Sequence, residues 1–190
     1  MEADWEVEIG RDAPLIDAAW EGLIDLRRAP ELSRQLPESS QLPALASVLV
    51  QLNSELSPVW TSKCDVWRPE VFDANELDAR PEEGNCALAC YIDLVPRGDR
   101  LWPSLDYAIA QCKAICGRLH NIALRCCRAD LVIRQAHIAP GRQDLGITAY
   151  LTACGPTLDS ARATLESTLG ALGQSVLSPE HPARAASRLQ

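Results

Sequence analysis

The chain has 190 residues and a formal net charge of −8, and 47% of its residues are hydrophobic. A hydrophobic content this high excludes a chain that is disordered throughout. The acidic balance disfavours nucleic-acid binding, which usually depends on a basic patch or stripe. Composition therefore predicts a globular protein with no nucleic-acid partner.

The N-terminal residues, MEADWEVEIG, are acidic and lack the basic and apolar regions of a signal peptide. No hydrophobic run approaches the roughly 18 residues that a membrane span requires. We therefore expect a cytoplasmic protein with no membrane partner. In that compartment the eight cysteines are expected to stay reduced and not to form a disulfide framework.

The first third of the chain predicts two short strands, a helix and a longer strand. Strand patterns occupy 5–9 and 22–27, and apolar residues at helical spacing follow over 39–53. Ser40 is the expected N-cap of that helix. The segment VWTSKCDVW, residues 59–67, has the composition of a strand.

The rest of the chain predicts strands and helices in a regular order. We expect a strand over 86–95 and a helix over 102–120. A hairpin of strands over 126–134 and 145–154 follows, and then a helix over 155–173. The Pro-Gly turn in APGRQD joins the two strands of the hairpin. Thr157 is the expected N-cap of the last helix and Gly173 its expected end.

The order strand, strand, helix recurs three times, which suggests a fold built from ββα units. Strict alternation of apolar and polar residues is typical of an antiparallel sheet with one covered face. The predicted fold is an α+β two-layer sandwich, with a mainly antiparallel sheet of about six strands and three main helices on one face. We expect a single domain over 1–177 and a flexible tail over 178–190.

Regular alternation along WTSKCDVW separates its side chains into two sets. One set faces the helices and comprises Trp60, Ser62, Cys64 and Val66. The other set faces away and comprises Thr61, Lys63, Asp65 and Trp67. The lysine and the aspartate would then lie on the opposite side from the cysteine and could not activate it.

The same alternation in the other strands predicts the composition of the sheet face without helices. That face carries Lys63, Asp65, Trp67, Tyr91, Asp93, Arg128, Asp130, Arg134, Thr148 and Tyr150. Aromatic side chains among charges are typical of recognition surfaces. The alternative is a solvated face whose ion pairs each contribute less than about 1 kcal/mol.

We therefore expect a non-enzymatic binding or assembly module that uses this face and needs no cofactor. Its partner would be another protein or a second copy of the chain in a homodimer. The alternative hypothesis is a thiol-dependent enzyme or a redox or metal-binding protein. Whether the chain is an enzyme is left open by its sequence.

The thiol hypothesis depends on Cys154 and Cys126, which alternation places on the polar face of their strands. Cys154 also precedes a helix N-terminus, where the pKa of a thiol is lowered. Cys112, Cys116 and His120 are spaced to stack along one helix, as metal ligands could. Both of those cysteines fall in an apolar stripe, so we expect them in the core and expect no metal site.

Overall fold

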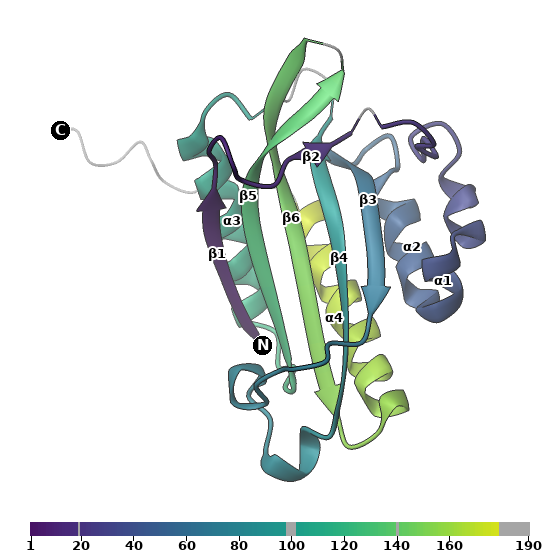
Figure 1. Cartoon of the computed structure of the whole chain (residues 1–190), viewed down its shortest axis with the longest axis vertical. Helices are drawn as coiled ribbons and strands as arrows, with labels where there is room; N and C mark the ends of the chain where they lie inside the picture. Colours follow the sequence, from purple (N-terminus) through teal and green to yellow (C-terminus); the bar gives the residue numbers. More distant parts are fainter. Residues whose placement is uncertain (19, 98–101, 140, 179–190) are drawn as a thin grey trace, which may run out of the picture.

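The computed structural model describes residues 1–18, 20–97, 102–139 and 141–178 (Figure 1). The strands are β1 (Glu2–Glu8), β2 (Ile16–Asp17), β3 (Val59–Trp67), β4 (Cys86–Pro96), β5 (Cys127–Ala139) and β6 (Arg142–Gly155). The helices are α1 (Pro37–Gln41), α2 (Pro43–Leu52), α3 (Leu105–His120) and α4 (Leu158–Leu177), with 3-10 turns η1 (Pro30–Gln35), η2 (Asn75–Leu77) and η3 (Pro81–Glu83). Apart from Ser178, the predicted tail lies outside the described residues.

The six strands form one mixed sheet in the order β1-β5-β6-β4-β3, and β2 pairs with the far part of β5. The pairs β3–β4, β4–β6 and β5–β6 are antiparallel, and the predicted hairpin is confirmed as β5–β6. The prediction of a mainly antiparallel sheet is wrong, because β1 and β2 both run parallel to β5. Alternation fixes which face a side chain occupies but not the direction of the neighbouring strand.

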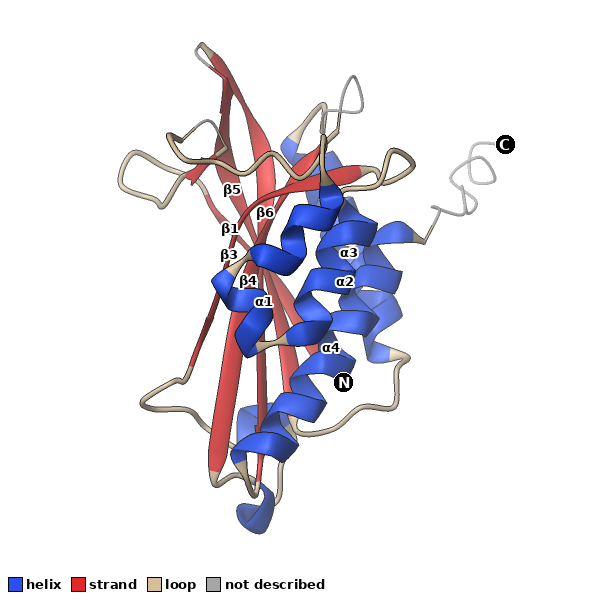
Figure 2. Cartoon of the chain, turned by 90° about the vertical axis from the view of Figure 1, so that its right-hand side faces the viewer, coloured by secondary structure: helices blue, strands red, loops and turns tan. Residues whose placement is uncertain are grey.

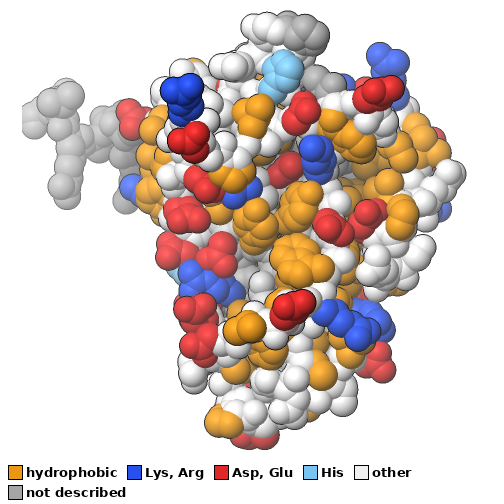
Figure 3. Space-filling view, viewed as in Figure 1, with side chains coloured by type: hydrophobic (Ala, Val, Ile, Leu, Met, Phe, Trp, Pro, Cys, Tyr) orange, Lys and Arg blue, Asp and Glu red, His pale blue; other side chains and the backbone are white. Residues whose placement is uncertain are grey.

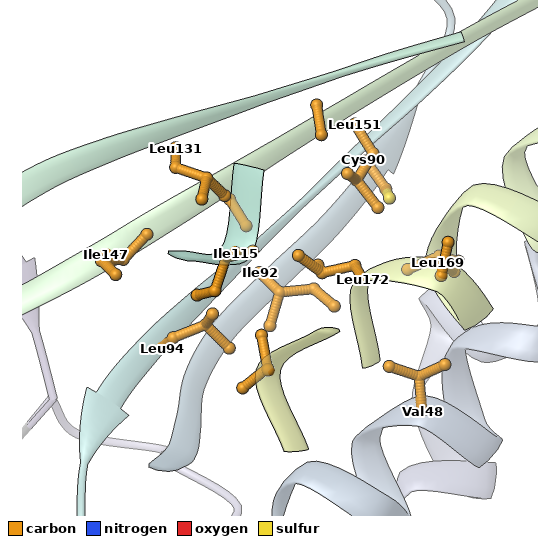
Figure 4. Packing of buried hydrophobic residues seen from close by; sticks show 14 of the residues in the cluster. Val48, Cys90, Ile92, Leu94, Ile115, Leu131, Ile147, Leu151, Leu169 and Leu172 are labelled. Carbon is orange, nitrogen blue, oxygen red and sulfur yellow. The ribbon is translucent and has the colours of Figure 1, made fainter. Parts of the chain in front are cut away.

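The main helices lie on one side of the sheet (Figure 2). Helix α4 packs on β4, β5 and β6 and contacts α2 and α3. The core between helices and sheet holds large apolar side chains from both (Figure 4), among them Val48, Ile92, Ile115, Leu131, Ile147, Leu151, Leu169 and Leu172. Among the described residues no α-helix packs on the other side of the sheet, and that side faces the viewer in Figure 1.

The first predicted helix is divided in two. Helix α1 ends at Gln41 and α2 begins at Pro43, with Leu42 in a non-helical conformation between them (φ −137°, ψ 84°). Proline has no N–H to continue a helix and disfavours helical geometry in the residue before it. The predicted N-cap, Ser40, therefore lies inside α1.

Helix α4 begins as predicted but ends later. The Thr157 hydroxyl accepts a hydrogen bond from the Ser160 N–H at 3.2 Å, so Thr157 is the N-cap. Gly173 does not end the helix, which continues to Leu177. A Cβ at Gly173 would lie 3.4 Å from a methyl of Val48, so this glycine faces α2 at the contact between the two helices.

The strand predicted over 22–27 is an irregular turn. The Asp25 carboxylate accepts hydrogen bonds from the Arg27 backbone N–H at 3.1 Å and from its guanidinium at 2.7 and 2.9 Å. Such local bonds to the backbone compete with pairing in a sheet. The second strand is instead Ile16–Asp17, which the sequence pattern missed.

A β-bulge between Thr61 and Cys64 corrects the predicted faces of β3. Cys64 and Val66 face the helices as expected. Trp60 does not, because it packs with Val95 on the other side of the sheet. Thr61 faces the helices in its place, because its hydroxyl accepts a hydrogen bond at 2.7 Å from the side-chain amide of Asn53, which follows α2. The extra residue of a bulge shifts the alternation, so the two ends of β3 follow opposite phases.

Candidate functional site

The candidate site is the side of the sheet without helices, which we call the open face. The strand registers place Asp65, Tyr91, Tyr150 and Asp130 in one row across β3, β4, β6 and β5. The two adjacent rows hold four more of the predicted residues, namely Trp67, Asp93, Arg128 and Thr148, and Arg134 lies one row further along β5, opposite Gly146. The tenth, Lys63, lies in the bulge of β3. Their common side follows from the registers, whereas their role in binding stays a prediction.

Three aromatic rings form a continuous row on the open face. The centroids of Trp67 and Tyr91 lie 6.2 Å apart, and those of Tyr91 and Tyr150 lie 5.9 Å apart. Both distances and the tilted ring planes fit favourable aromatic pairs. Burial, with the nearby Asp93 carboxylate, raises the pKa of Tyr91 to about 12, so its phenol is neutral at neutral pH. The row offers flat apolar surface with hydroxyls at its edge.

A chain of polar side chains runs beside the aromatic row. The Thr148 hydroxyl donates to the Asp93 carboxylate at 2.6 Å. The Arg134 guanidinium donates to the Thr148 hydroxyl at 3.3 Å, to the Tyr150 hydroxyl at 3.0 Å and to the Glu8 carboxylate at 2.6 and 3.0 Å. One arginine therefore links strands β1, β5 and β6 across the open face.

Asp93 is the more deeply buried of the two acids in this chain of hydrogen bonds, with 6% of its surface exposed. Its pKa is raised above the ordinary value, chiefly because burial penalises the charged carboxylate. The Thr148 hydrogen bond and the charges of Arg134 and Lys63 act in the opposite direction and only partly offset burial. A buried carboxyl with a raised pKa is a common feature of functional sites and also occurs in structural networks.

We expect Asp93→Asn to raise stability at neutral pH. Because the native pKa lies above the unfolded value of 3.8, the native state binds the proton more tightly, and stability falls as pH rises through that interval. Asparagine stays neutral and still accepts the Thr148 hydrogen bond. Urea unfolding at several pH values should give free energies of unfolding for the variant and the wild type that converge below about pH 4 and separate as pH rises.

The exposed Asp65 provides the control for this prediction, because Asp65→Asn removes a carboxylate from the adjacent row of the same sheet face. The difference in free energy of unfolding between Asp65→Asn and the wild type should not grow over the pH interval in which Asp93 titrates. A constant difference between Asp93→Asn and the wild type from acid to neutral pH would contradict a costly buried carboxylate.

The N-terminal segment covers the upper part of the open face, where the chain crosses in front of the sheet in Figure 1. A small cluster there buries Ile16 and Ala18 against Trp60, Val95 and Ala136. The crossing is fixed by hydrogen bonds from the Ala18 N–H to the His137 carbonyl at 2.8 Å and from the Ser62 hydroxyl to the Asp17 carbonyl at 3.1 Å. The sequence pattern did not predict that this segment covers the sheet, because it missed the strand Ile16–Asp17 that belongs to the segment.

A hollow of about 240 Å³ lies where this segment meets the bulge of β3. Trp20, Ile24, Lys63 and Tyr91 contribute to its lining. The Lys63 ammonium lies 5.4 Å from the centroid of the Trp20 ring, within the range of a cation–π contact. The hollow therefore lies beside the middle ring of the aromatic row, between Tyr91 and an apolar wall that carries a cation.

Acidic side chains surround the aromatic row on two sides. Figure 3 shows them gathered along the β1 side of the face, where alternation directs Glu2, Asp4, Glu6 and Glu8 outward. The loop over 68–84, which packs at the far end of the face, carries six acids and two arginines. Arg128 is itself paired with Asp130 at 2.7 Å. The rim of the open face is therefore predominantly negative.

The two thiol candidates lie together beneath that loop. Cys154 is fully buried in an apolar cluster with Leu77 and Ala87, and Cys126 packs against the same cluster. Burial raises the pKa of Cys154 to about 11, opposite to the lowering expected from the helix N-terminus. Burial and the Glu83 carboxylate also raise the pKa of Cys126. Neither thiol has the environment of an activated nucleophile.

The stack of Cys112, Cys116 and His120 does not converge on one point. Both cysteines are buried in the core, whereas His120 is exposed at the end of α3. Within the described parts of the chain, no three or more His, Cys, Asp or Glu side chains gather as metal ligands would. All eight cysteines are free thiols in the structure, and their redox state in the cell stays a prediction.

Neither a protein-family model, nor a curated protein, nor a solved structure matches this chain. Among the described helices, none has both the length and the hydrophobicity needed to cross a bilayer. The geometry of the open face is therefore the basis on which a function can be proposed.

Proposed function

We propose that this chain is a non-enzymatic binding module whose open face holds a basic segment of a protein partner. The observation that carries the proposal is the row of Trp67, Tyr91 and Tyr150, held on a sheet face that the helices leave uncovered. Tryptophan and tyrosine are enriched among the residues that dominate binding energy. Supporting it is the α+β arrangement, which we infer to be a two-layer sandwich containing the ββα units β3-β4-α3 and β5-β6-α4.

The charge of the rim favours a cationic partner. Acids from β1 and from the loop over 68–84 surround the row, and the whole chain carries a net charge of −8. Lysine and arginine side chains would gain from both this field and the aromatic faces. A second copy of the chain would bring two negative rims together, which disfavours the homodimer.

The size of the hollow beside Tyr91 favours a protein partner over a small ligand. Its volume of about 240 Å³ is below the roughly 300–1,000 Å³ of typical small-molecule sites. A single side chain of a bound segment would fill such a space. The alternative of a thiol-dependent enzyme has less support, because the raised pKa values of Cys126 and Cys154 disfavour their thiolates.

We expect Trp67→Ala to weaken binding of a basic peptide at least tenfold. Truncation of an aromatic residue that dominates an interface typically costs about 2 kcal/mol or more of binding free energy, and about 1.4 kcal/mol corresponds to a factor of ten. The measurement is fluorescence anisotropy of a labelled arginine-rich peptide and of its counterpart with glutamate in place of arginine. The arginine peptide should bind to the wild type more tightly, and salt should weaken it.

Tyr107→Ala is the matched control, because Tyr107 is 39% exposed and Trp67 is 37% exposed. Tyr107 belongs to α3 and lines a separate hollow of about 330 Å³. Equal losses in the two variants, or equal binding of the two peptides, would contradict the proposed site. A dimer in sedimentation that Trp67→Ala dissociates would instead identify the partner as a second copy.

A further inference from the structure

Cys126 directly precedes β5 and lies opposite Cys154 of the adjacent strand β6, at the end of the open face beneath the loop over 68–84. The register pairs Cys127 with Ala153, so one step further opposes Cys126 and Cys154. The Cys154 N–H donates to the Cys126 carbonyl at 2.8 Å, which fixes the spacing of the two backbones. The two thiols are also within hydrogen-bonding reach of each other.

This placement suits a disulfide. Residues opposite each other across an antiparallel hydrogen bond have Cα atoms about 5.5 Å apart, within the roughly 4.4–6.8 Å that disulfides span. Cys126 adopts a left-handed backbone with φ of 60°, which is uncommon outside glycine and bends the chain just before β5. Both side chains nevertheless pack in one cluster, so the bend does not separate the sulfurs.

The neighbours of the pair leave one sulfur partly accessible. Cys126 is half-buried, whereas Cys154 is fully buried. The Cys126 thiol is hydrogen-bonded to the Glu83 carboxylate, and Arg125 pairs with Asp78 at 3.0 Å and with Glu83 at 3.5 Å. These contacts hold the loop over Cys154 and keep the Glu83 carboxylate beside the Cys126 thiol.

We propose that Cys126 and Cys154 are a redox-active pair that a hydroperoxide converts to an intramolecular disulfide. The Cys126 thiol loses its proton to solvent, and its sulfur attacks one oxygen of the hydroperoxide. The O–O bond breaks, Cys126 becomes a sulfenic acid, and the other oxygen takes a proton from solvent and leaves as water or an alcohol. The Cys154 sulfur then attacks the Cys126 sulfur. The S–S bond forms, and the hydroxyl leaves as water with the Cys154 proton, so two electrons pass from the thiols to the peroxide.

Other neighbouring cysteines do not share this geometry. Cys64 and Cys90 face the helices from β3 and β4, but they are diagonal neighbours rather than opposite residues. Cys112 and Cys116 are one helical turn apart and buried in the core. The raised pKa values of Cys126 and Cys154 make their oxidation slow at neutral pH and faster as pH rises. The product is therefore expected under sustained oxidation.

Peptide mapping of the native wild-type protein tests the proposal. The reduced protein is exposed to hydrogen peroxide, unfolded, alkylated and digested, and the fragments are identified by mass spectrometry. We expect two fewer alkylated thiols and a Cys126–Cys154 crosslink that dithiothreitol removes. Because Cys127 is adjacent, the crosslink must be assigned by fragmentation between Cys126 and Cys127.

Two variants complete the experiment. Cys126→Ser keeps a donor for Glu83 and should abolish the crosslink, whereas Cys86→Ser alters another half-buried cysteine and should leave it intact. A crosslink through Cys127, or full alkylation of Cys126 and Cys154 after other cysteines have oxidised, would overturn the proposal. The wild-type map decides the question even if Cys126→Ser does not fold.

Discussion

Replacing Arg134 with methionine should lower the free energy of unfolding by about 2–3 kcal/mol at neutral pH. The Arg134 side chain is 13% exposed and holds Glu8, Thr148 and Tyr150 together. Removing one member of a buried ion pair costs about 3–5 kcal/mol. We reduce that figure because Glu8 is 40% exposed and is solvated once it loses its partner.

The loss should depend on pH through Asp93. Arg134 lowers the pKa of Asp93, so its removal leaves the ionised carboxylate with less compensation. The penalty should be smaller in acid, where Asp93 is protonated, and larger at neutral pH. Urea unfolding of Arg134→Met, Asp93→Asn and the double variant forms a cycle in which the double variant should recover part of the loss.

Arg128→Met is the matched control on the same strand and face. Arg128 is 30% exposed and pairs with Asp130 and Asp4 near the rim, so its removal should cost less than about 1 kcal/mol. Equal losses for the two arginines, or a strictly additive cycle with Asp93→Asn, would show that Arg134 does not organise the face.

The faces of the inner strands could be predicted from the sequence because they depend on local alternation. Cys90 and Ile92 face the helices while Tyr91 and Asp93 face away, and each assignment needs only the neighbouring residues. The same reasoning failed at Trp60, since a single extra residue in a bulge reverses the phase and leaves no local signature.

The partners of the edge strands could not be predicted, because they depend on contacts distant in the chain. Glu8 meets Arg134 across 126 residues, and β1 runs parallel to β5, which no periodic pattern reports. The aromatic and charged composition of the open face was therefore predictable, whereas its cover by residues 16–18 and the chain from Asp93 to Glu8 were not.

Gly146→Val should destabilise the protein by about 3 kcal/mol and uncover the upper part of the open face. A Cβ at this position would lie 2.7 Å from the end of the Ile16 side chain and 3.1 Å from the Leu94 carbonyl oxygen. The strand backbone cannot move away without breaking its pairing, so we expect the valine side chain to displace Ile16. Exposing a fully buried isoleucine costs about 1.5–3 kcal/mol, and residual overpacking adds to this.

Hydrogen exchange reports whether the N-terminal segment detaches. The Ala18 N–H donates to the His137 carbonyl, so its protection should fall in Gly146→Val while the amides of the β4–β6 pairing stay protected. Gly117→Ala is the control for adding a side chain to a glycine. Nothing lies within 4 Å of its Cβ position in α3, and alanine should stabilise that helix by about 0.5–1 kcal/mol.

A double variant separates displacement of Ile16 from distortion of the sheet. Ile16→Ala removes the atom that the new side chain meets, so the costs of Gly146→Val and Ile16→Ala should combine to less than their sum. If the two costs add fully, the clash lies at the Leu94 carbonyl oxygen instead, and the N-terminal segment stays bound to the sheet. If the segment does detach, the upper part of the open face around Trp60 and Val95 gains exposed area. Binding of the arginine-rich peptide to the Gly146→Val variant would then show whether residues 16–18 limit access to the open face.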